Sequence, residues 1–420
     1  MKKIVTASLL TFFYLFFSFV ATGQKIENVN ITPNRVNSPL QQQKPYLFII
    51  SIDAFRYDYL DKYVAPFLQK MASAGVRAKS MYPSFPSKTF PNHYTLVTGL
   101  LPAHHGLVGN KMLNRITDAR YKMSDYEQVH DASWYGGTPI WVLAEQQRML
   151  TANYFWPLTD VKIQGILPSY YFHYTEANTF QKRLDDIVDW MRLPDSTRPH
   201  LIMLYFPQVD HAGHRFGPDA PETGATVTQV DSFLHVMYDA IAATGLPVNF
   251  MLMSDHGMKA VDVEHPLQAP EIDGSVGDMV VDGSTVNYYI KDDTKIDSIY
   301  TSFLMQNNNG YKIYTKMNIP LKYHYGQVDD WYSRLGDIIL LAKTPYFFGK
   351  KLSTGEHGFD PYEEPDMRAT FIAWGPAIRS GKKINAFKNI EVYPLAAKLL
   401  GLQTHAPIDG KGILIKKVLR

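Results

Sequence analysis

Four short apolar runs, rich in Leu, Ile, Phe and Met, stand out along the chain, and each ends at or near an acidic residue or a glycine. Runs that are apolar throughout, rather than at alternate positions, are typical of strands buried on both faces of a mainly parallel sheet. We therefore predict four such strands, at residues 46–52, 200–206, 248–254 and 370–375.

Amphipathic segments lie between these runs. Apolar residues recur in them at the three- and four-residue spacing of helices that bury one face. The predicted helices cover residues 58–74, 138–149, 178–191 and 222–243. This alternation indicates an α/β sandwich with a mainly parallel central sheet flanked by helices. We expect a single domain over residues 45–416, with Tyr-rich insertions around 110–135 and 290–335 that cover the site.

The first 44 residues carry a different pattern. Lys2 and Lys3 precede an apolar run over residues 4–20 and then small residues, which is the pattern of a secretory signal peptide over residues 1–23. An uncleaved membrane anchor is the alternative, because the run is long for a signal core and short for a membrane span. The polar residues 24–44 are expected to form a flexible tether. The protein is thus expected to be exported, periplasmic or secreted, with no transmembrane domain once the signal is cleaved.

Composition narrows the function classes. The 420 residues carry a formal net charge of +2, with 45% hydrophobic and 20% charged residues, as ordinary globular proteins do. Near-neutral charge argues against a nucleic-acid-binding surface, and the composition is compatible with a small-molecule substrate. The chain has no cysteine, which excludes disulfides and a lipidated Cys anchor. The sequence contains no GxGxxG or P-loop pattern, so it does not support a dehydrogenase or a kinase. The oligomeric state is left open.

Thr89 lies at the centre of the most distinctive stretch, residues 82–99. Pro83 and Pro86 make its lead-in loop-like, and Pro91 stands where a proline is favoured in the first turn of a helix. The Thr89 hydroxyl is therefore predicted at a helix N-terminus, where free N–H groups and the helix dipole favour an anion. A threonine becomes a good nucleophile only when a base or a metal ion activates it.

Carboxylate and imidazole side chains recur at three other places in the chain. Three aspartates lie at or just past the ends of apolar runs, and the carboxyl ends of parallel strands meet at one edge of a sheet. Two histidines follow these aspartates within four residues, and a third stands between glycines. Mixed Asp/His ligation suits Zn²⁺. The candidate ligands are Asp53, Asp210, His214, Asp255, His256 and His357.

Seven segments of the chain carry a resemblance to a known family. They are Ser51-Ile-Asp-Ala-Phe-Arg56, Phe85-Pro-Ser-Lys-Thr-Phe-Pro-Asn-His-Tyr-Thr-Leu-Val-Thr-Gly99, His105-Gly-Leu-Val-Gly-Asn110, Val209-Asp-His-Ala-Gly-His-Arg-Phe-Gly-Pro218, Ser254-Asp-His-Gly-Met258, His357-Gly358 and Asn389-Ile-Glu-Val-Tyr393. With them, residues 45–416 resemble the nucleotide pyrophosphatase/phosphodiesterase family of the alkaline phosphatase superfamily. The resemblance implies an alkaline-phosphatase-like fold and a two-zinc enzyme that hydrolyses nucleotide phosphodiester or phosphoanhydride bonds to nucleoside 5′-monophosphates.

The resemblance also implies roles for individual residues. One Zn²⁺ would be held by Asp53, Thr89, Asp255 and His256, and the other by Asp210, His214 and His357. Thr89 would be the nucleophile and form a covalent phospho-threonine intermediate. Asn110 would stabilise a phosphate oxygen, as oxyanion-hole donors do. Without the resemblance, Asn110 is better explained as a turn residue.

Aromatic residues are implied for the substrate. The resemblance suggests that Phe90 and Tyr171 sandwich a nucleobase and that Tyr205 lies near the sugar or phosphate. From the residues alone, Tyr205 is better explained as a core residue, since aromatics beside strands usually pack. His93 is interpreted as a packing histidine. Residues 156–160 read Trp-Pro-Leu-Thr-Asp, where nucleotide-cleaving relatives often carry Gly-Ser after the Pro, so the base pocket is expected to differ there.

Two alternatives stay open for the function. Some members of the family cleave choline-headed lipids, so glycerophosphocholine, a lysophospholipid or a sphingolipid is an alternative substrate for the same two-metal chemistry. A non-catalytic, metal-stabilised binding protein is a more distant alternative. It would require the loss of a ligand or of the nucleophile, and the sequence retains them all.

Overall fold

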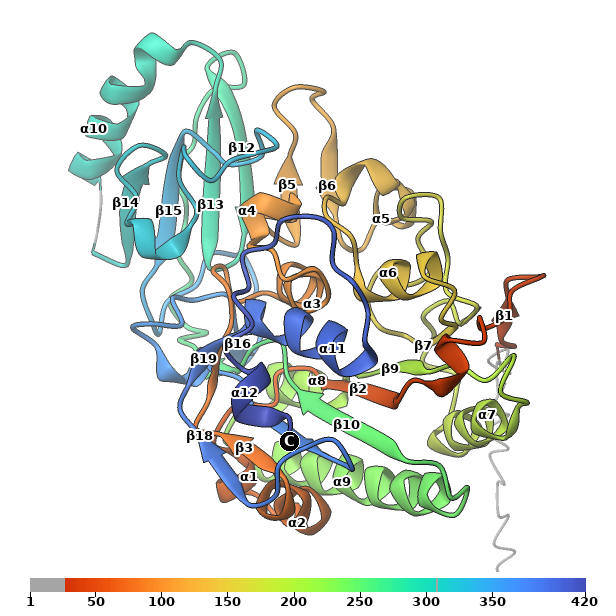
Figure 1. The fold of residues 1–420 in the computed structure, drawn as a ribbon. Helices are drawn as coiled ribbons and strands as arrows, with labels where there is room; N and C mark the ends of the chain where they lie inside the picture. Colours follow the sequence, from red (N-terminus) through yellow and green to blue (C-terminus); the bar gives the residue numbers. More distant parts are fainter. Residues whose placement is uncertain (1–26, 307–308) are drawn as a thin grey trace, which may run out of the picture.

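A large twisted sheet forms the centre of the computed structural model, which describes residues 27–306 and 309–420 (Figure 1). Within these residues the sheet orders β1 (Asn30–Ile31), β8 (Tyr170–Tyr171), β7 (Thr151–Tyr154), β9 (Leu201–Phe206), β2 (Tyr46–Ile52), β10 (Val248–Met253), β17 (Phe371–Trp374), β3 (Val76–Ala78) and β18 (Lys382–Ile384). The five strands β8, β7, β9, β2 and β10 run parallel to one another. The predicted, mainly parallel sheet is confirmed, although the fourth predicted strand, β17, runs antiparallel to β10.

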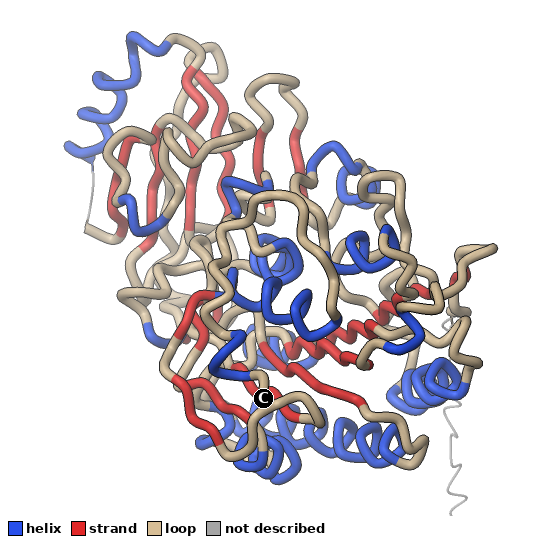
Figure 2. Tube along the Cα trace, viewed as in Figure 1, coloured by secondary structure: helices blue, strands red, loops and turns tan. Residues whose placement is uncertain are grey.

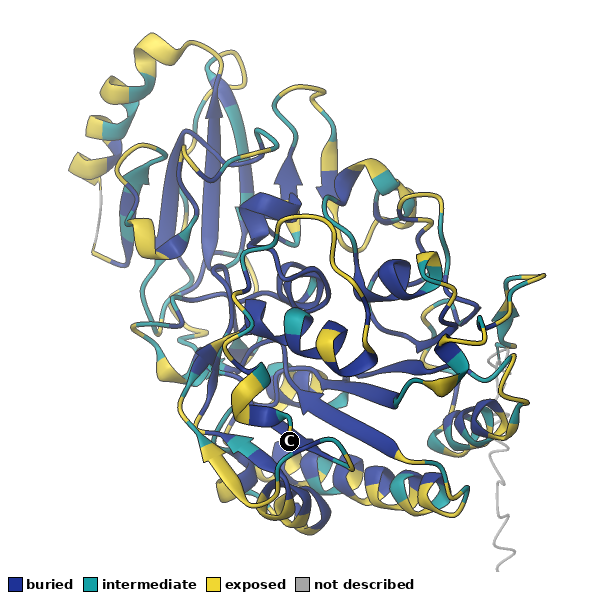
Figure 3. Cartoon of the chain, viewed as in Figure 1, coloured by how far each residue is buried: buried dark blue, intermediate teal, exposed yellow. Residues whose placement is uncertain are grey.

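Helices cover both faces of this sheet (Figure 2). One face is covered by α2 (Pro66–Ala74), α7 (Phe180–Arg192) and α9 (Pro221–Ala242), and the other by α3 (Thr89–Thr98), α6 (Ile140–Gln146) and α11 (Val392–Leu400). Side chains of β2 alternate between the two layers: Leu47 and Ile49 pack in the core that holds α3 and α11, and Phe48 and Ile50 pack with α2 and α9. The central strands are buried on both faces (Figure 3), and the predicted α/β sandwich is confirmed.

Shorter elements surround these layers. The short helices are α1 (Tyr59–Lys62), α4 (Pro102–His105), α5 (Tyr126–His130), α8 (Gln208–Phe216) and α12 (Ile415–Val418). Two-stranded pairs join β4 (Met81–Tyr82) to β19 (Phe387–Lys388), β5 (Lys111–Leu113) to β6 (Arg120–Lys122), and β11 (Lys259–Ala260) to β16 (Gly355–Glu356). The helix predicted over 58–74 is divided into α1 and α2, because Pro66 begins the second helix and cannot continue the first.

A second, four-stranded sheet stands apart from the main one, at the upper left of Figure 1. Its order is β12 (Gly277–Asp282), β13 (Thr285–Ile290), β15 (Ile338–Ala342) and β14 (Tyr311–Thr315), and all pairs are antiparallel. It has its own apolar cluster, to which α10 (Ile296–Gln306) contributes Phe303. The insertion predicted around residues 290–335 is therefore part of a small antiparallel unit. Its first strand, β12, ends at Asp282.

The segment expected to be a flexible tether is packed against the domain over its described part. Strand β1 pairs with β8, and the Asn37 side chain is buried. Asn37 Nδ2 donates to the carbonyls of Asp195 (2.9 Å) and Arg198 (2.7 Å), and its Oδ1 accepts from the Leu150 N–H (2.8 Å). These bonds make residues 30–44 an edge of the fold. Polarity alone did not reveal them, because their partners lie more than a hundred residues away.

The predicted signal peptide, residues 1–23, lies outside the described residues. In the part of the chain that the structure describes, no helix combines the length and the apolar character needed to cross a membrane.

Candidate metal centre and substrate cleft

Thr89 begins helix α3, as predicted, and its position is fixed by the loop before it. Lys88 has an extended backbone and precedes the first helical residue. The buried side chain of Asn92, one turn into the helix, accepts from the Ser84 N–H (2.7 Å) and donates to the carbonyls of Pro86 and Lys88 (both 2.9 Å). These bonds hold the Pro-rich lead-in against the helix start, so the Thr89 hydroxyl stands at a defined place over the sheet edge.

The first candidate ligand group comes from the ends of two adjacent parallel strands. Asp53 follows β2, and Asp255 and His256 follow β10. All three are buried, and one donor atom of each lies within 4.8 Å of the others. His256 Nε2 is 3.1 Å from Asp255 Oδ2, 3.5 Å from Asp53 Oδ1 and 3.2 Å from Thr89 Oγ1. The structure thus brings together the four residues implied for one zinc site.

The second candidate group adjoins the first. Asp210 and His214 lie one turn apart on α8, and His357 follows β16; their donor atoms also lie within 4.8 Å of one another. His214 Nε2 is 3.4 Å and His357 Nε2 is 4.0 Å from Asp210 Oδ1. The His357 ring stacks on the His256 ring with 3.8 Å between centroids. The two ligand groups are therefore in direct contact through these stacked rings. The three residues implied for the second zinc site also lie together.

Three carboxylates lie close together at these two groups, which favours a bound cation. Burial raises the pKa of Asp53 well above its ordinary range, and the carboxylates of Asp255 and Asp210 raise it further. Burial also opposes the charge of Asp255, but His256 and His93 outweigh it and lower that pKa. Asp53 Oδ1, Asp210 Oδ1 and Asp255 Oδ2 are buried and have no hydrogen-bond donor among the described residues. Buried, unpaired carboxylate oxygens that point at histidines fit a metal centre with mixed Asp/His ligands.

The histidines are oriented as metal ligands usually are. The Nδ1 atoms of His214, His256 and His357 face the carbonyls of Gly355 (2.7 Å), Gly257 (2.8 Å) and Ser87 (3.0 Å). Because a carbonyl only accepts, Nδ1 carries the proton and Nε2 presents a lone pair to the carboxylates. Burial lowers the pKa of His256, and burial together with His256 and His214 lowers that of His357, so both favour the neutral, ligating form.

His93 behaves differently, as expected for a packing histidine. Its Nδ1 faces the Thr89 carbonyl (2.9 Å), but its Nε2 is 2.8 Å from the Ser51 hydroxyl, which can donate to it. Both ring nitrogens are therefore satisfied within the protein.

Asn110 is held by the backbone of Phe90, next to Thr89, and by Asp282, a residue that the sequence did not single out. Its Oδ1 accepts from the Phe90 N–H (3.2 Å), and its own N–H donates to Asp282 Oδ2 (2.9 Å). The buried Lys88 Nζ donates to the Asp282 carbonyl (2.5 Å) and lies 3.6 Å from Asp282 Oδ2. Asp282 is the last residue of β12, in the second sheet. No local sequence pattern marks Asp282, because its contact with Asn110 depends on how the second sheet packs against the rest of the domain.

A cleft of about 480 Å³ opens next to Thr89. Phe90, Tyr174 and Tyr205 line it together with Thr89 and Asp53. The Tyr205 hydroxyl donates to Asp53 Oδ2 (2.5 Å). Tyr205 therefore contacts a candidate ligand directly, and it also packs in the core below the cleft.

The resemblance implies a base-stacking role for Tyr171, but Tyr171 is not among the described residues that line this cleft. It is the last residue of β8, where it pairs with Asn30 of β1 and Asn153 of β7. Tyr174, three residues further, does line it. The cleft lies beyond the carboxyl ends of the parallel strands, so a residue past the end of β8 reaches it and a residue within the strand does not. Tyr174 is therefore the aromatic residue of this segment that lines the cleft together with Phe90.

Comparisons with known proteins agree with this architecture. The sequence model of the family described as type I phosphodiesterase / nucleotide pyrophosphatase matches residues 47–362. Ectonucleotide pyrophosphatase/phosphodiesterase family member 1 of Mus musculus is 33% identical over 393 residues, which cover 89% of this chain and 42% of that relative, so the chain spans less than half of its length. The venom phosphodiesterase of Naja atra is 30% identical over 378 residues, or 87% of this chain and 45% of the relative.

A shorter relative and a solved structure cover more of their own length. Family member 5 of Homo sapiens is 30% identical over 378 residues, or 88% of this chain and 77% of the relative. The murine ectonucleotide pyrophosphatase/phosphodiesterase 5, solved as an inactive threonine-to-alanine variant in complex with AMP, superposes with a TM-score of 0.82 at 28% identity, covering 90% of this chain and 100% of that one. The chain therefore belongs to the type I phosphodiesterase/nucleotide pyrophosphatase family, within the alkaline phosphatase superfamily.

Proposed function

We propose that the protein is a metal-dependent phosphodiesterase and nucleotide pyrophosphatase that releases nucleoside 5′-monophosphates. One observation carries this proposal: the Thr89 hydroxyl, at the start of α3, adjoins two Asp/His groups and opens onto an aromatic-lined cleft. The family match and the nucleotide-cleaving names of the relatives support the same reaction.

Two Zn²⁺ ions fit the two ligand groups. Asp53, Thr89, Asp255 and His256 would hold one, and Asp210, His214 and His357 would hold the other. When bound, they would activate the nucleophile and neutralise charge on the reacting phosphate.

The chain's own residues then have distinct tasks. Thr89 Oγ1 gives its proton to solvent and attacks phosphorus, which forms a nucleotidyl–threonine ester. The bond from phosphorus to the leaving oxygen breaks in the same step, and the leaving group departs into the cleft as an oxyanion or takes a proton from solvent. Water then cleaves this ester and frees Thr89. Because Asn110 Oδ1 is held by the Phe90 N–H, its amide Nδ2 is turned away from that bond and is available to a non-bridging phosphate oxygen. The free N–H groups at the start of α3 also favour the negative charge of this phosphate oxygen.

The cleft supplies contacts for the nucleoside. A base placed between Phe90 and Tyr174 gains stacking energy that is worth roughly 1–3 kcal/mol and does not depend strongly on base identity. Tyr205 lines the cleft near the place of the sugar and phosphate, and its hydroxyl positions Asp53. The AMP complex of the murine relative shows that a member of the family can hold a nucleotide.

The cleft also bears on the choline alternative. A choline cation would favour free carboxylates, and Asp160 and Glu176 do line the cleft. However, Asp160 is contacted by two histidines, and Glu176 accepts from the Tyr174 hydroxyl (3.3 Å). Neither carboxylate stands without a polar neighbour, and the nucleotide-cleaving names of the relatives and the AMP complex make nucleotides the substrate class that we favour.

We also propose export, to the periplasm or as a secreted protein, with residues 1–23 as the signal peptide. The charged start, apolar run and small-residue exit of this segment support export, as do the venom relatives.

A comparison of chromogenic esters tests the substrate class. The zinc-loaded protein is assayed with the p-nitrophenyl esters of thymidine 5′-monophosphate and of phosphocholine, and with p-nitrophenyl phosphate as the monoester control. A higher kcat/KM for the thymidine ester is expected. Preference for the phosphocholine ester would overturn the nucleotide assignment, and preference for the monoester would overturn the diesterase assignment.

A further inference from the structure

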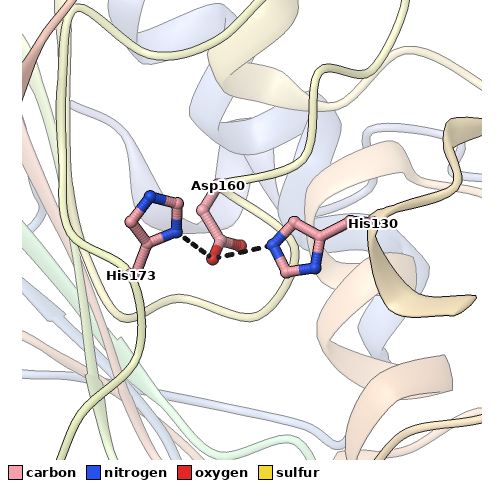
Figure 4. A group of neighbouring side chains, drawn as sticks. All are labelled: His130, Asp160 and His173. Atoms are coloured by element: carbon pink, nitrogen blue, oxygen red, sulfur yellow. Dashed lines mark hydrogen bonds and ion pairs between the residues drawn. The ribbon is translucent and has the colours of Figure 1, made fainter. Parts of the chain in front are cut away.

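Three side chains form a third cluster of metal-ligand type in the wall of the cleft, apart from the two ligand groups of the candidate metal centre (Figure 4). His130 ends α5, Asp160 lies in the loop after β7, and His173 lies in the loop after β8. His130 Nε2 and His173 Nδ1 both point at one carboxylate oxygen, Asp160 Oδ2, at 3.2 Å and 3.0 Å. One donor atom of each residue lies within 4.8 Å of the others.

The hydrogen bond at His130 Nδ1 shows which ring nitrogen carries the proton. His130 Nδ1 is 2.8 Å from the Tyr126 carbonyl, which can only accept, so Nδ1 carries a proton. In the neutral ring, Nε2 then presents a lone pair to a carboxylate oxygen that is also an acceptor. Two acceptors at 3.2 Å repel each other unless a positive charge lies between them or on the ring. A metal ion supplies that charge and accepts both lone pairs.

The same arrangement recurs at the candidate metal centre. His214 and His256 also direct Nδ1 to a backbone carbonyl and Nε2 to a carboxylate, at 3.4 Å and 3.1 Å. Zinc ligands at 2.0–2.1 Å in tetrahedral geometry lie about 3.3 Å apart. The nitrogen–oxygen separations in the third cluster are close to that value.

We propose that His130, Asp160 and His173 form a further binding site for a divalent transition-metal ion of the Zn²⁺ class, with an open position toward the cleft. Two imidazoles and a carboxylate are a ligand set that such ions prefer. The Tyr126 ring stacks on His130 with 3.9 Å between centroids and closes one side of the site. The ion would tie together three segments of the cleft wall that are distant in sequence.

Zinc content tests this site without reference to turnover. Wild-type protein, Asp160→Asn and His173→Ala are stripped by chelation, dialysed against buffered Zn²⁺ and analysed for zinc per chain. Each variant is expected to hold one zinc ion fewer than the wild type, and zinc should raise the unfolding temperature of the wild type more than that of either variant. Asp160→Asn keeps the shape of Asp160, and its amide can donate to the His130 lone pair, so a folded variant is expected; circular dichroism checks this.

Two controls separate this proposal from the proposed function. His265→Ala removes a histidine that contacts a single carboxylate, Asp262 (2.9 Å), with no third ligand, and should leave zinc content unchanged. His357→Ala should lose zinc from the candidate metal centre and keep the ion at Asp160. Equal zinc content in the wild type, Asp160→Asn and His173→Ala would overturn the third site, whatever His357→Ala shows. Unchanged zinc in His357→Ala alone would instead count against the proposed metal centre.

Discussion

At the scale of single residues, hydrogen-bond direction distinguishes the histidines that can bind metal from those that pack. His256 and His357 give Nδ1 to a backbone carbonyl and keep Nε2 for a carboxylate, whereas the Ser51 hydroxyl satisfies Nε2 of His93. The sequence predicted which residues are of ligand type, because Asp and His stand at strand ends. It did not single out Tyr174, because which of the tyrosines near β8 lines the cleft depends on where that strand ends in space.

Thr89→Ala tests the nucleophile. The substitution removes only the reacting hydroxyl, so we expect kcat to fall at least about 1,000-fold while most zinc is retained, given the scale of effects when a catalytic nucleophile is lost. Rate and zinc content are measured on the same sample. Substantial turnover in this variant would remove threonine from the nucleophile role.

Tyr174→Ala and Tyr171→Ala form a matched pair that tests the stacking partner. Loss of one stacking ring, worth roughly 1–3 kcal/mol, should lower kcat/KM for a nucleotide ester about 5- to 150-fold in Tyr174→Ala. Tyr171→Ala should stay close to the wild type. The opposite ranking would restore Tyr171 as the stacking residue.

At the scale of elements, continuous apolar runs predicted the central strands well, because burial on both faces leaves a signal within each strand. Strand β2 (Tyr46–Ile52) matches its predicted range, and β9 and β10 differ by one residue at one end. Long-range contacts carried no such signal. The pairing of β1 with β8 and the place of β12 beside the site both depend on partners far away in the chain.

A partly buried charge network between α4 and the C-terminal segment predicts a pH dependence of stability. His104 Nδ1 is 2.9 Å from Asp409 and its Nε2 is 3.2 Å from Asp329, while His324 also faces Asp329 (3.4 Å) and Trp331 stacks on the ring. Burial lowers the pKa of His104, but the two carboxylates outweigh it and raise that pKa above 6.5. Burial raises the pKa of Asp409, but His104 outweighs it and lowers that pKa below 3.8.

The sign follows from these two directions. The His104 contribution is fully present below pH 6.5 and is lost as pH rises through its raised pKa. The Asp409 contribution is present above pH 3.8 and is lost as pH falls through its lowered pKa. His104→Gln should therefore lower the free energy of unfolding by about 1–2 kcal/mol near pH 5–6, and by less above neutral pH. Denaturant unfolding across pH measures this, and a difference that grows above neutral pH would contradict it.

At the scale of the whole molecule, parallel strands from distant parts of the chain deliver acidic residues to one edge of the sheet. Asp53 and Asp255 follow adjacent strands, and Asp210 follows β9 on the other side of β2. The second sheet then reaches over this edge and holds Asn110 through Asp282. The fold thus collects three buried carboxylates at one place, and stability should depend on their neutralisation.

Metal removal tests that dependence. A chelator should lower the unfolding temperature by several degrees, since a ligand at a hundred times its Kd stabilises by about 3 kcal/mol. Added Zn²⁺ should restore the temperature, while added Mg²⁺ serves as a control because it disfavours imidazole ligands. An unfolding temperature that does not respond to chelation and Zn²⁺ would mean that these carboxylates do not hold a metal.

Stereochemistry at phosphorus tests the central claim, catalysis through Thr89, most directly. A single diastereomer of a thymidine 5′-phosphorothioate aryl ester is hydrolysed in ¹⁸O-labelled water, and the configuration of the product is determined. Attack by Thr89 followed by attack of water gives two in-line displacements, so net retention is expected. Net inversion would mean that water attacks phosphorus directly, and it would contradict a covalent threonine intermediate.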